Sequence, residues 1–573
     1  MSTLNVKRLP YGISNFEDLI TENYAYVDKT QFIALLENES NPYQFFIRPR
    51  KFGKSLFFSL LFNYYGITKA NKFEQLFGNL YIGKNPTPKK NAYAIMLFNF
   101  SGIDTSSEEE FRSSFSFRIK HTVHKFLIEH HNLFPNTDAL IQKVLTETTG
   151  IDALSVAYNA AQSAGVPIFA IIDEYDHFAN DLIAMGGHMG KEVYKAMVQA
   201  NGLVRDFYEM LKIGTSDVLK RIFITGISPV MLNDLTSGFN IAANLTLNLK
   251  YNEMMGFTQE EVYALMKETG VNPDLINVDM KLYYDGYLFH AEGEHHVYNP
   301  AMILFFFNQL VADKKPPRQL VDDNLKTDYG RLQRLAENEN NRIKLMEITK
   351  NNSIVSEIIS QFSLDRMYSD EYFVSLLLYM GLLTIDKFEE GAYRLKIPNY
   401  SIQTLYWEYI VKMIADMNRE VVVDTSAQNA ALRELAYRGN PHLYVECISR
   451  NILQRLSNRD LIHFDEKYIK IMLLNGLFQS NLYIPISEKE VEGGYIDLFL
   501  QRSPLLPDIK YEWIWEVKYL KVEDEAKLPD KRTEAAAQLD KYRQSERFAG
   551  RSDLKYASLI FIGKDRYEVN ERS

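Results

Sequence analysis

The sequence contains little of what marks secreted, membrane-spanning or strongly basic proteins. Cys447 is the only cysteine among 573 residues, so no intramolecular disulfide forms and a reducing compartment is expected. The longest nearly apolar run, residues 373–385, is shorter than the ~20 residues needed to cross a bilayer. Lysine and arginine total 64 against 74 for aspartate and glutamate, so a surface for nucleic acid would have to be local. We therefore expect a cytoplasmic protein without a membrane segment, long enough for several domains.

The first informative pattern is a strand, a loop and a helix near the N-terminus. An apolar run that ends at Ile47 predicts a buried strand, and Gly53, Lys54 and Ser55 open an apolar helix. In this setting, backbone N–H groups and the helix N-terminus bind phosphates. Lys54 would contact the β- and γ-phosphates, and the Ser55 hydroxyl would hold magnesium. The pattern asks for glycine where Arg48 stands, so a basic turn before a buried helix is the alternative.

Polar side chains also follow two later strands. Residues 167–172 form an apolar run that ends in Asp173 and Glu174. Asp173 would coordinate magnesium, and Glu174 would polarise the attacking water as general base. After the next strand, Thr225 or Ser228 would lie between the first two strands and bond the water or the γ-phosphate. Because strands alternate with helices, a largely parallel sheet is expected, and the combined motifs favour nucleotide binding over an acidic turn.

A second set of chemically active side chains lies in the C-terminal part. Segments 494–500 and 511–518 are predicted to be neighbouring strands that carry Asp497 and Glu516. Lys518 shares a face with Glu516, because side chains alternate along a strand. Two carboxylates and an ammonium on one face are costly unless they bind something, and magnesium would neutralise the acids. Lys518 would then orient or deprotonate an attacking water, as in metal-dependent phosphodiester hydrolysis; a solvated ion-pair ladder is the alternative.

The middle of the chain is predicted to be mostly helical. Thr258 and Glu261 form a capping-box pattern ahead of one helix. Residues 372–385 run from helix to strand, and Glu390-Gly391 predicts a hairpin turn before another strand. This order is compatible with a winged helix, which would either enter a DNA groove or pack against the rest of the protein.

These motifs together resemble the AAA-ATPase-like family of bacterial proteins, whose members often end in a PD-(D/E)XK nuclease-like domain. The resemblance covers nearly the whole chain, and an arginine at position 48 is similar to the family's own habit. The C-terminal strands and the helix after them resemble the PD-(D/E)XK nuclease superfamily. The segments that carry the family resemblance are residues 26–30, 48–55, 172–176, 225–228, 235–241, 283–287 and 298–300.

The resemblance implies ATP and Mg²⁺ as cofactors and a set of site residues. Magnesium would be held by Ser55 and Asp173 in one site and by Asp497 and Glu516 in the other. Glu466 is a candidate for an additional carboxylate. The matching cofactor-binding positions are Arg48, Arg50, Lys51, Gly53, Lys54, Ser55, Asp173 and Thr225. The matching catalytic positions are Glu174, Asp497, Glu516, Lys518 and Gln538.

We therefore predict an α/β multidomain protein. It would have a P-loop NTPase (AAA-like) parallel-sheet domain over residues 1–250, a helical region with a possible winged helix over 251–425, and a restriction-endonuclease-like α/β domain over 426–573. The predicted function is an NTP-binding, magnesium-dependent nuclease acting on nucleic acid, with DNA preferred as substrate, regulated by ATP binding or hydrolysis. One alternative is a non-catalytic, nucleotide-dependent switch with a vestigial nuclease fold, which binds a protein partner through its helical middle, or a DNA partner. Another is an ATPase motor whose C-terminal domain merely holds DNA. The sequence is also compatible with a homo-oligomer.

Overall fold

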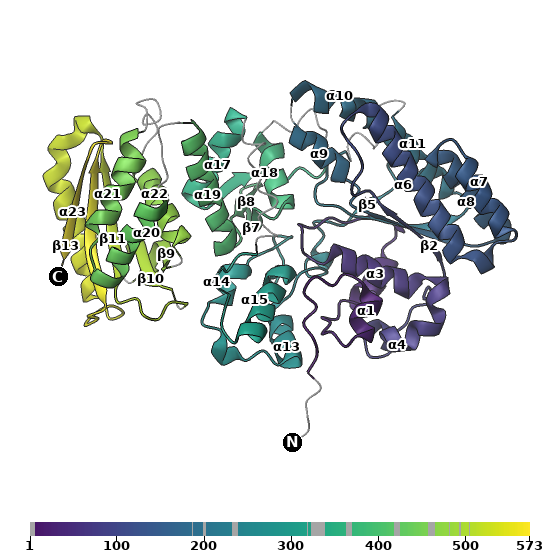
Figure 1. The fold of residues 1–573 in the computed structure, drawn as a ribbon, viewed down its shortest axis with the longest axis horizontal. Helices are drawn as coiled ribbons and strands as arrows, with labels where there is room; N and C mark the ends of the chain where they lie inside the picture. The colour runs from purple at the N-terminus through teal and green to yellow at the C-terminus, as the bar shows by residue number, and fades with distance from the viewer. Residues whose placement is uncertain are drawn as a thin grey trace, which may run out of the picture.

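Figure 1 shows three parts in a row, from the N-terminal part through a mainly helical middle to the C-terminal sheet. The computed structural model describes residues 6–185, 187–198, 202–231, 239–317, 319–322, 338–362, 370–417, 425–455, 465–480, 482–491, 494–503 and 505–572. Most of the segment 235–241, one of the motifs named above, lies outside the described residues. Within the described ranges, no helix combines the length and apolar character needed to cross a bilayer.

The N-terminal part is built around a parallel sheet with strand order β2-β3-β4-β1-β5. Its strands are β1 (Tyr43–Phe45), β2 (Ala94–Asn99), β3 (Ile168–Asp173), β4 (Leu219–Ile224) and β5 (Ala243–Asn244). Its helices are α1 (Phe16–Thr21), α2 (Gln31–Asn38), α3 (Lys54–Tyr65), α4 (Phe73–Phe77), α5 (Tyr81–Lys84), α6 (Glu108–Glu129), α7 (Thr137–Thr146), α8 (Gly150–Ala164), α9 (His177–Met185), α10 (Gly187–Val198) and α11 (Leu203–Gly214).

Both faces of this sheet are buried, which explains the continuous apolar run of β3. Ile168, Ala170 and Ile172 pack with residues of α6, α8 and α11, whereas Phe169 and Ile171 pack with residues of α2, α3 and α4. A strand covered on both sides carries apolar residues at successive positions rather than at alternate ones. Because β4 lies between β1 and β3, the ends of the strands that carry the predicted nucleotide motifs meet at one edge of the sheet.

The middle part contains the elements expected of a winged helix. It consists of α13 (Gln259–Thr269), α14 (Met280–Tyr284), α15 (Pro300–Asp313), α17 (Glu339–Asn351), β6 (Ser353–Ser356), α18 (Asp370–Tyr379), β7 (Thr384–Glu389), β8 (Ala392–Lys396) and α19 (Tyr400–Met417). The capping box of Thr258 and Glu261 is confirmed. The hairpin turn is confirmed too, because Glu390 and Gly391 join β7 to β8 with φ angles of 53° and 83°.

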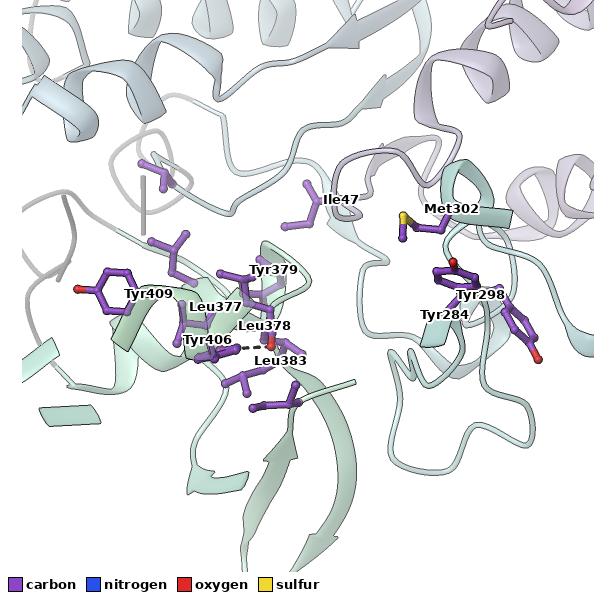
Figure 2. Packing of buried hydrophobic residues seen from close by; sticks show 14 of the residues in the cluster. Ile47, Tyr284, Tyr298, Met302, Leu377, Leu378, Tyr379, Leu383, Tyr406 and Tyr409 are labelled. Atoms are coloured by element: carbon purple, nitrogen blue, oxygen red, sulfur yellow. Dashed lines mark hydrogen bonds between the residues drawn. The ribbon is translucent and has the colours of Figure 1, made fainter. Parts of the chain in front are cut away.

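The helix and hairpin that the sequence suggested as a winged helix pack against the rest of the protein. In α18, which precedes the hairpin, every side chain from Phe373 to Tyr379 is buried. Figure 2 shows Leu377 and Tyr379 of this helix and Tyr406 of α19 in one apolar cluster with Ile47, which follows β1. The structure therefore favours the second of the two roles that the sequence left open.

The C-terminal part is a mixed sheet with strand order β13-β12-β11-β10-β9 between helices. β11 and β12 are parallel and joined through α23, and the other pairs are antiparallel. Trp515 packs on Tyr444 of α21, whereas Ile514 packs with Leu539 of α23, so helices cover both faces. The elements are α20 (Thr425–Arg433), α21 (His442–Asn451), α22 (Glu466–Gln479), β9 (Tyr483–Val491), β10 (Gly494–Arg502), β11 (Glu512–Leu520), α23 (Leu528–Gln544), β12 (Leu554–Ile562) and β13 (Arg566–Arg572).

Candidate functional site

The loop of residues 48–55 connects β1 to α3 in the predicted order of strand, loop and helix. Gly53 precedes the helix with φ of +96°, a conformation that other residues adopt only with strain. The Lys54 Nζ donates hydrogen bonds to the backbone oxygens of Arg48 and Pro49, both at 2.8 Å. Burial lowers the pKa of Lys54 to about 8 against the opposing effect of Asp173, so the ammonium stays mostly protonated at neutral pH. The loop thus holds the Lys54 ammonium against its own backbone oxygens.

The Arg48 side chain points into the core and lies outside the lining of the neighbouring cleft. Its guanidinium donates to the backbone oxygens of Ile47 at 3.0 Å, Thr246 at 2.7 Å and Tyr251 at 2.8 Å. The side chain is 1% exposed and lies between the rings of Phe46 and Phe289. Arg48 therefore ties the loop to the segment after β5. The structure does not bring this predicted nucleotide ligand to the cleft.

Replacing Arg48 with glycine, the residue that the phosphate-loop pattern asks for, is expected to destabilise the protein by about 3–5 kcal/mol. The substitution leaves three buried carbonyl oxygens without their donor and a cavity between two aromatic rings. Denaturant unfolding measures the loss. Arg48→Lys, which keeps the charge but not the planar fork, should give an intermediate value. Wild-type stability in Arg48→Gly would show that this anchor contributes nothing.

The strand-end carboxylates lie opposite the loop. Burial and the adjacent Glu174 raise the pKa of Asp173 to about 7, while Lys54 opposes this shift. Glu174 has a φ of +51°, an uncommon value for a residue other than glycine, and its N–H donates to Asp173 Oδ1 at 2.9 Å. Its Oε2 lies 3.6 Å from His177 Nδ1. The two acids therefore sit in different surroundings, with Asp173 buried and Glu174 partly open.

Thr225 occupies the predicted position between β1 and β3, but its hydroxyl faces the sheet. Thr225 Oγ1 donates to the backbone oxygen of Phe46 and is fully buried. Ser228 is also engaged, because its hydroxyl donates to Asp176 Oδ2 at 2.8 Å. Both hydroxyls therefore hold the strand ends together in this structure, rather than facing the cleft as the sequence predicted.

A cleft of about 780 Å³ opens over the loop and the acids. Arg50, Lys51, Lys54 and Ser55 line it together with Asp173 and Glu174, at the polar end. Apolar side chains line the remainder: Leu19, Ala25, Ile227, Met254, Met255, Phe257, Leu265 and Leu304. Large size, apolar walls and a few convergent charged groups are typical of a cofactor site. The loop backbone, Lys54, Ser55 and Asp173 fit a nucleoside triphosphate with magnesium.

The second site lies where β10 and β11 meet. The register pairs Leu498 with Trp515, which places Asp497 and Glu516 at the next position on each strand. Lys518 Nζ donates to Glu516 Oε1 at 2.6 Å and lies 3.6 Å from Asp497 Oδ2. The predicted convergence of the two carboxylates and the ammonium is therefore present in the structure, and all three side chains are nearly buried.

One oxygen of this cluster is buried without a donor. Among the residues that the structure describes, no N–H or hydroxyl group donates to Glu516 Oε2 or to the buried Oε1 of Gln538 on α23, and a hydrogen bond between Glu516 and Asp497 requires Glu516 to be protonated. Burial and the neighbouring Asp497 raise the pKa of Glu516 to about 8, although Lys518 opposes the shift. A buried acceptor without a partner costs free energy unless a proton or a cation satisfies it.

The raised pKa of Glu516 predicts a pH dependence of stability in the metal-free protein. Because the folded state holds the proton more tightly than the unfolded state, this stabilisation is full below pH ~4.5 and lost as pH rises through ~8. Between pH 6 and pH 9, wild type should lose about 2–3 kcal/mol relative to Glu516→Gln. Fluorescence of Trp513 and Trp515, which lie on the same sheet, reports the unfolding. Equal pH profiles for the two proteins would contradict the shift.

Helix α22 adds two charged residues to the cluster. Glu466, the candidate additional carboxylate, has its pKa raised by burial, with Lys518 opposing. The sequence analysis did not identify the second residue, Lys470. Its Nζ donates a hydrogen bond to Asp497 Oδ1 and lies 3.5 Å from Glu466 Oε1. Lys470 follows Glu466 by four residues, so the sequence indicates that the two side chains share one face of a helix. Nothing local in the sequence indicates that this face of α22 meets Asp497.

The carboxylate oxygens of this cluster suit a divalent metal, although two lysine ammonium groups lie among them. Carboxylate oxygens of Asp497, Glu516 and Glu466 are the ligands that magnesium prefers, and Glu516 Oε2 is free to serve. Within the described part of the chain, no three His, Cys, Asp or Glu side chains form a cluster ready for a metal ion. Here the carboxylates alternate with the ammonium groups of Lys470 and Lys518.

Fold and sites define a nucleotide-binding α/β domain joined to a nuclease-like α/β domain. Residues 10–236 match the family model AAA-ATPase_like, described as a predicted AAA-ATPase, and residues 464–571 match the PD-(D/E)XK nuclease superfamily model. The chain thus carries an AAA-ATPase-like domain and a C-terminal PD-(D/E)XK nuclease superfamily domain, and the resemblance seen in the motifs is confirmed. The domain boundaries at residues 250 and 425 stay predictions.

Individual relatives are distant. An uncharacterized protein in the vnfD 5' region of Azotobacter chroococcum mcd 1 is 24% identical over 305 residues, 53% of this chain and 52% of the relative, so the match spans about half of each. The Walker-type ATPase of Pyrococcus abyssi superposes with a TM-score of 0.37 at 11% identity, covering 66% of this chain and 94% of that one. Cdc6p of Pyrobaculum aerophilum gives a TM-score of 0.23 at 10% identity, covering 73% and 97%.

Proposed function

We propose that this protein is an ATP-binding, magnesium-dependent nuclease that cleaves DNA under the control of its nucleotide site. The convergence of Asp497, Glu516 and Lys518 carries the proposal, because Glu516 Oε2 is a buried oxygen that lacks a donor within the described residues. A buried carboxylate oxygen of this kind beside a second carboxylate is well suited to a divalent cation. The nuclease superfamily match over the same residues supports this assignment.

In the nuclease site, each side chain has a role that its position supports. Asp497 and Glu516 would hold Mg²⁺, with Glu466 as a further oxygen ligand. Magnesium supplies charge stabilisation for the phosphate under attack and for the leaving oxygen. Lys518 Nζ, 2.6 Å from Glu516 Oε1, would orient the attacking water by donating a hydrogen bond to it. The Gln538 Oε1, buried on α23, would accept a hydrogen bond from that water.

In the nucleotide site, Lys54 would move its hydrogen bonds from the loop oxygens to the β- and γ-phosphates. Ser55 Oγ and Asp173 would hold Mg²⁺, which neutralises phosphate charge. Glu174 would orient and polarise the attacking water, and His177, 3.6 Å away, would hold the Glu174 carboxylate in place. Arg50 and Lys51 line the cleft and would add positive charge near the phosphates.

Packing between the parts supports control of one site by the other. Pro49 of the loop lies against Gly381, where an added Cβ would come within 2.8 Å of the proline ring, and Phe52 packs edge-on against Tyr287. At the far side of the middle part, Tyr400 OH donates to the backbone oxygen of Pro485 on β9 at 3.2 Å. These contacts join rigid elements from the nucleotide cleft to the nuclease sheet, which is the kind of network that coupling requires.

The proposal is tested by cleavage of single- and double-stranded DNA and RNA in Mg²⁺ or Mn²⁺, with and without ATP. Cleavage by wild type that is lost in Asp497→Asn would establish the nuclease site, and a change in rate with ATP would establish control. If no substrate is cleaved under any condition while ATP still binds, the nuclease proposal fails. The protein would then be the alternative, a nucleotide-dependent switch that binds a protein or DNA partner.

A further inference from the structure

Lys470 places a second ammonium inside the nuclease site. Its side chain is 6% exposed, and its Nζ contacts Asp497 Oδ1 and lies 3.5 Å from Glu466 Oε1. The other oxygen of Asp497, Oδ2, accepts the backbone N–H of Val517 at 2.9 Å. Both oxygens of the central carboxylate are therefore already engaged, one of them by a cation that belongs to the chain.

The Lys470 ammonium lies between two of the carboxylates proposed to hold a metal ion. A buried lysine and a divalent cation both satisfy carboxylates, but they cannot occupy the same point between Glu466 and Asp497. With Lys470 and Lys518 in place, three carboxylates are largely neutralised, which weakens the attraction for a second cation. We propose that Lys470 holds the place of the divalent cation between Glu466 and Asp497, and that metal loads the site only when Lys470 withdraws.

The surroundings of α22 provide a place to which Lys470 can withdraw. Lys470 also lines a small cavity of about 30 Å³ between α22 and the middle part, where Gln403 and Trp407 lie beside two further lysines, Lys350 and Lys467. The same interface contains an ion pair between Lys350 of α17 and Asp465, which precedes α22. Because α22 packs on α17 and α19, movement of the middle part would change how far the Lys470 ammonium reaches into the site. This inference rests on the proposed nuclease function and specifies its regulation.

Direct binding of Mn²⁺ to the full chain without nucleotide tests the proposal, with electron paramagnetic resonance counting the free ion. Lys470→Met, which keeps the length and removes the charge, should bind Mn²⁺ at least about tenfold more tightly than wild type. The added affinity should disappear in the double variant with Asp497→Asn, which assigns it to this site. Lys510→Met removes an exposed lysine that precedes β11 and lies outside both the cluster and this cavity, so it should leave Mn²⁺ binding unchanged.

A second variant separates charge from folding. Lys470→Gln keeps a hydrogen-bond donor for Asp497 without the charge, so it should also tighten Mn²⁺ binding while tryptophan fluorescence reports a native sheet. Equal Mn²⁺ affinity in wild type, Lys470→Met and Lys470→Gln would overturn this inference, and the nuclease proposal would stand. If none of these proteins shows a Mn²⁺ site that depends on Asp497, both the inference and the proposed metal-dependent function fail.

Discussion

Glu516→Gln is expected to lower the rate of DNA cleavage about a thousandfold, measured as single-turnover cleavage of labelled DNA in Mg²⁺. Glutamine keeps the size of the side chain, which is 1% exposed, but cannot ionise, whereas Glu516 would give up its proton to offer Mg²⁺ a negative charge. Its Oε1 can still accept from Lys518 Nζ, but an amide nitrogen replaces the carboxylate oxygen Oε2, so the site loses an oxygen ligand for Mg²⁺. Both losses act in the transition state, where charge develops on the phosphate.

A matched substitution on the same sheet gives the control for this experiment. Glu568→Gln removes a carboxylate from β13 that pairs with Arg532 on the surface, and it should leave cleavage unchanged. ATP affinity should be the same in wild type and in both variants, because the nucleotide cleft lies in another part of the chain. Cleavage that survives in Glu516→Gln would place the nuclease activity outside this cluster.

Lys54→Met is expected to weaken ATP binding about a hundredfold, because one charge-assisted contact to the phosphates is lost from a buried site. Titration with a fluorescent nucleotide measures the effect. Lys54 is protonated at neutral pH despite its lowered pKa, so the wild-type contact carries a full charge. In the cleavage assay, the variant should keep its basal rate and lose the response to ATP.

Lys84→Met provides a control for the loss of a lysine in the same domain. Lys84 lies on α5, exposed and away from the residues that line the cleft, so its removal should leave ATP affinity as it is. Unchanged ATP affinity in Lys54→Met would contradict the assignment of the loop of residues 48–55 as the phosphate site.

The features that the sequence predicted well are those encoded locally. The β3 run, the helix that starts after Gly53 and the hairpin at Glu390-Gly391 all follow from neighbouring residues, and the structure has each of them. Glu516 and Lys518 likewise share a strand, so alternation alone places them together. Local patterns suffice wherever the partners are a few residues apart.

The features that the sequence missed depend on distant partners. The Arg48 guanidinium bonds to Thr246 and Tyr251, about 200 positions later, and no local pattern distinguishes such an anchor from a phosphate ligand. Lys470 meets Asp497 only because α22 packs on β9 and β11, the strands on either side of β10. The Thr225 hydroxyl was predicted at the right strand end, but its direction depends on the carbonyl of Phe46, which directly follows the neighbouring strand β1.

The tether of the loop to later residues has a consequence for synthesis on the ribosome. Thr246, Tyr251 and Phe289 complete the surroundings of Arg48, and Gly381 completes those of Pro49. Chains emerge from the N-terminus onward, so the loop of residues 48–55 must wait for more than half of the protein before it can take its final form. A nucleotide that binds at this loop would therefore meet its complete site only after the residues up to Gly381 have been made.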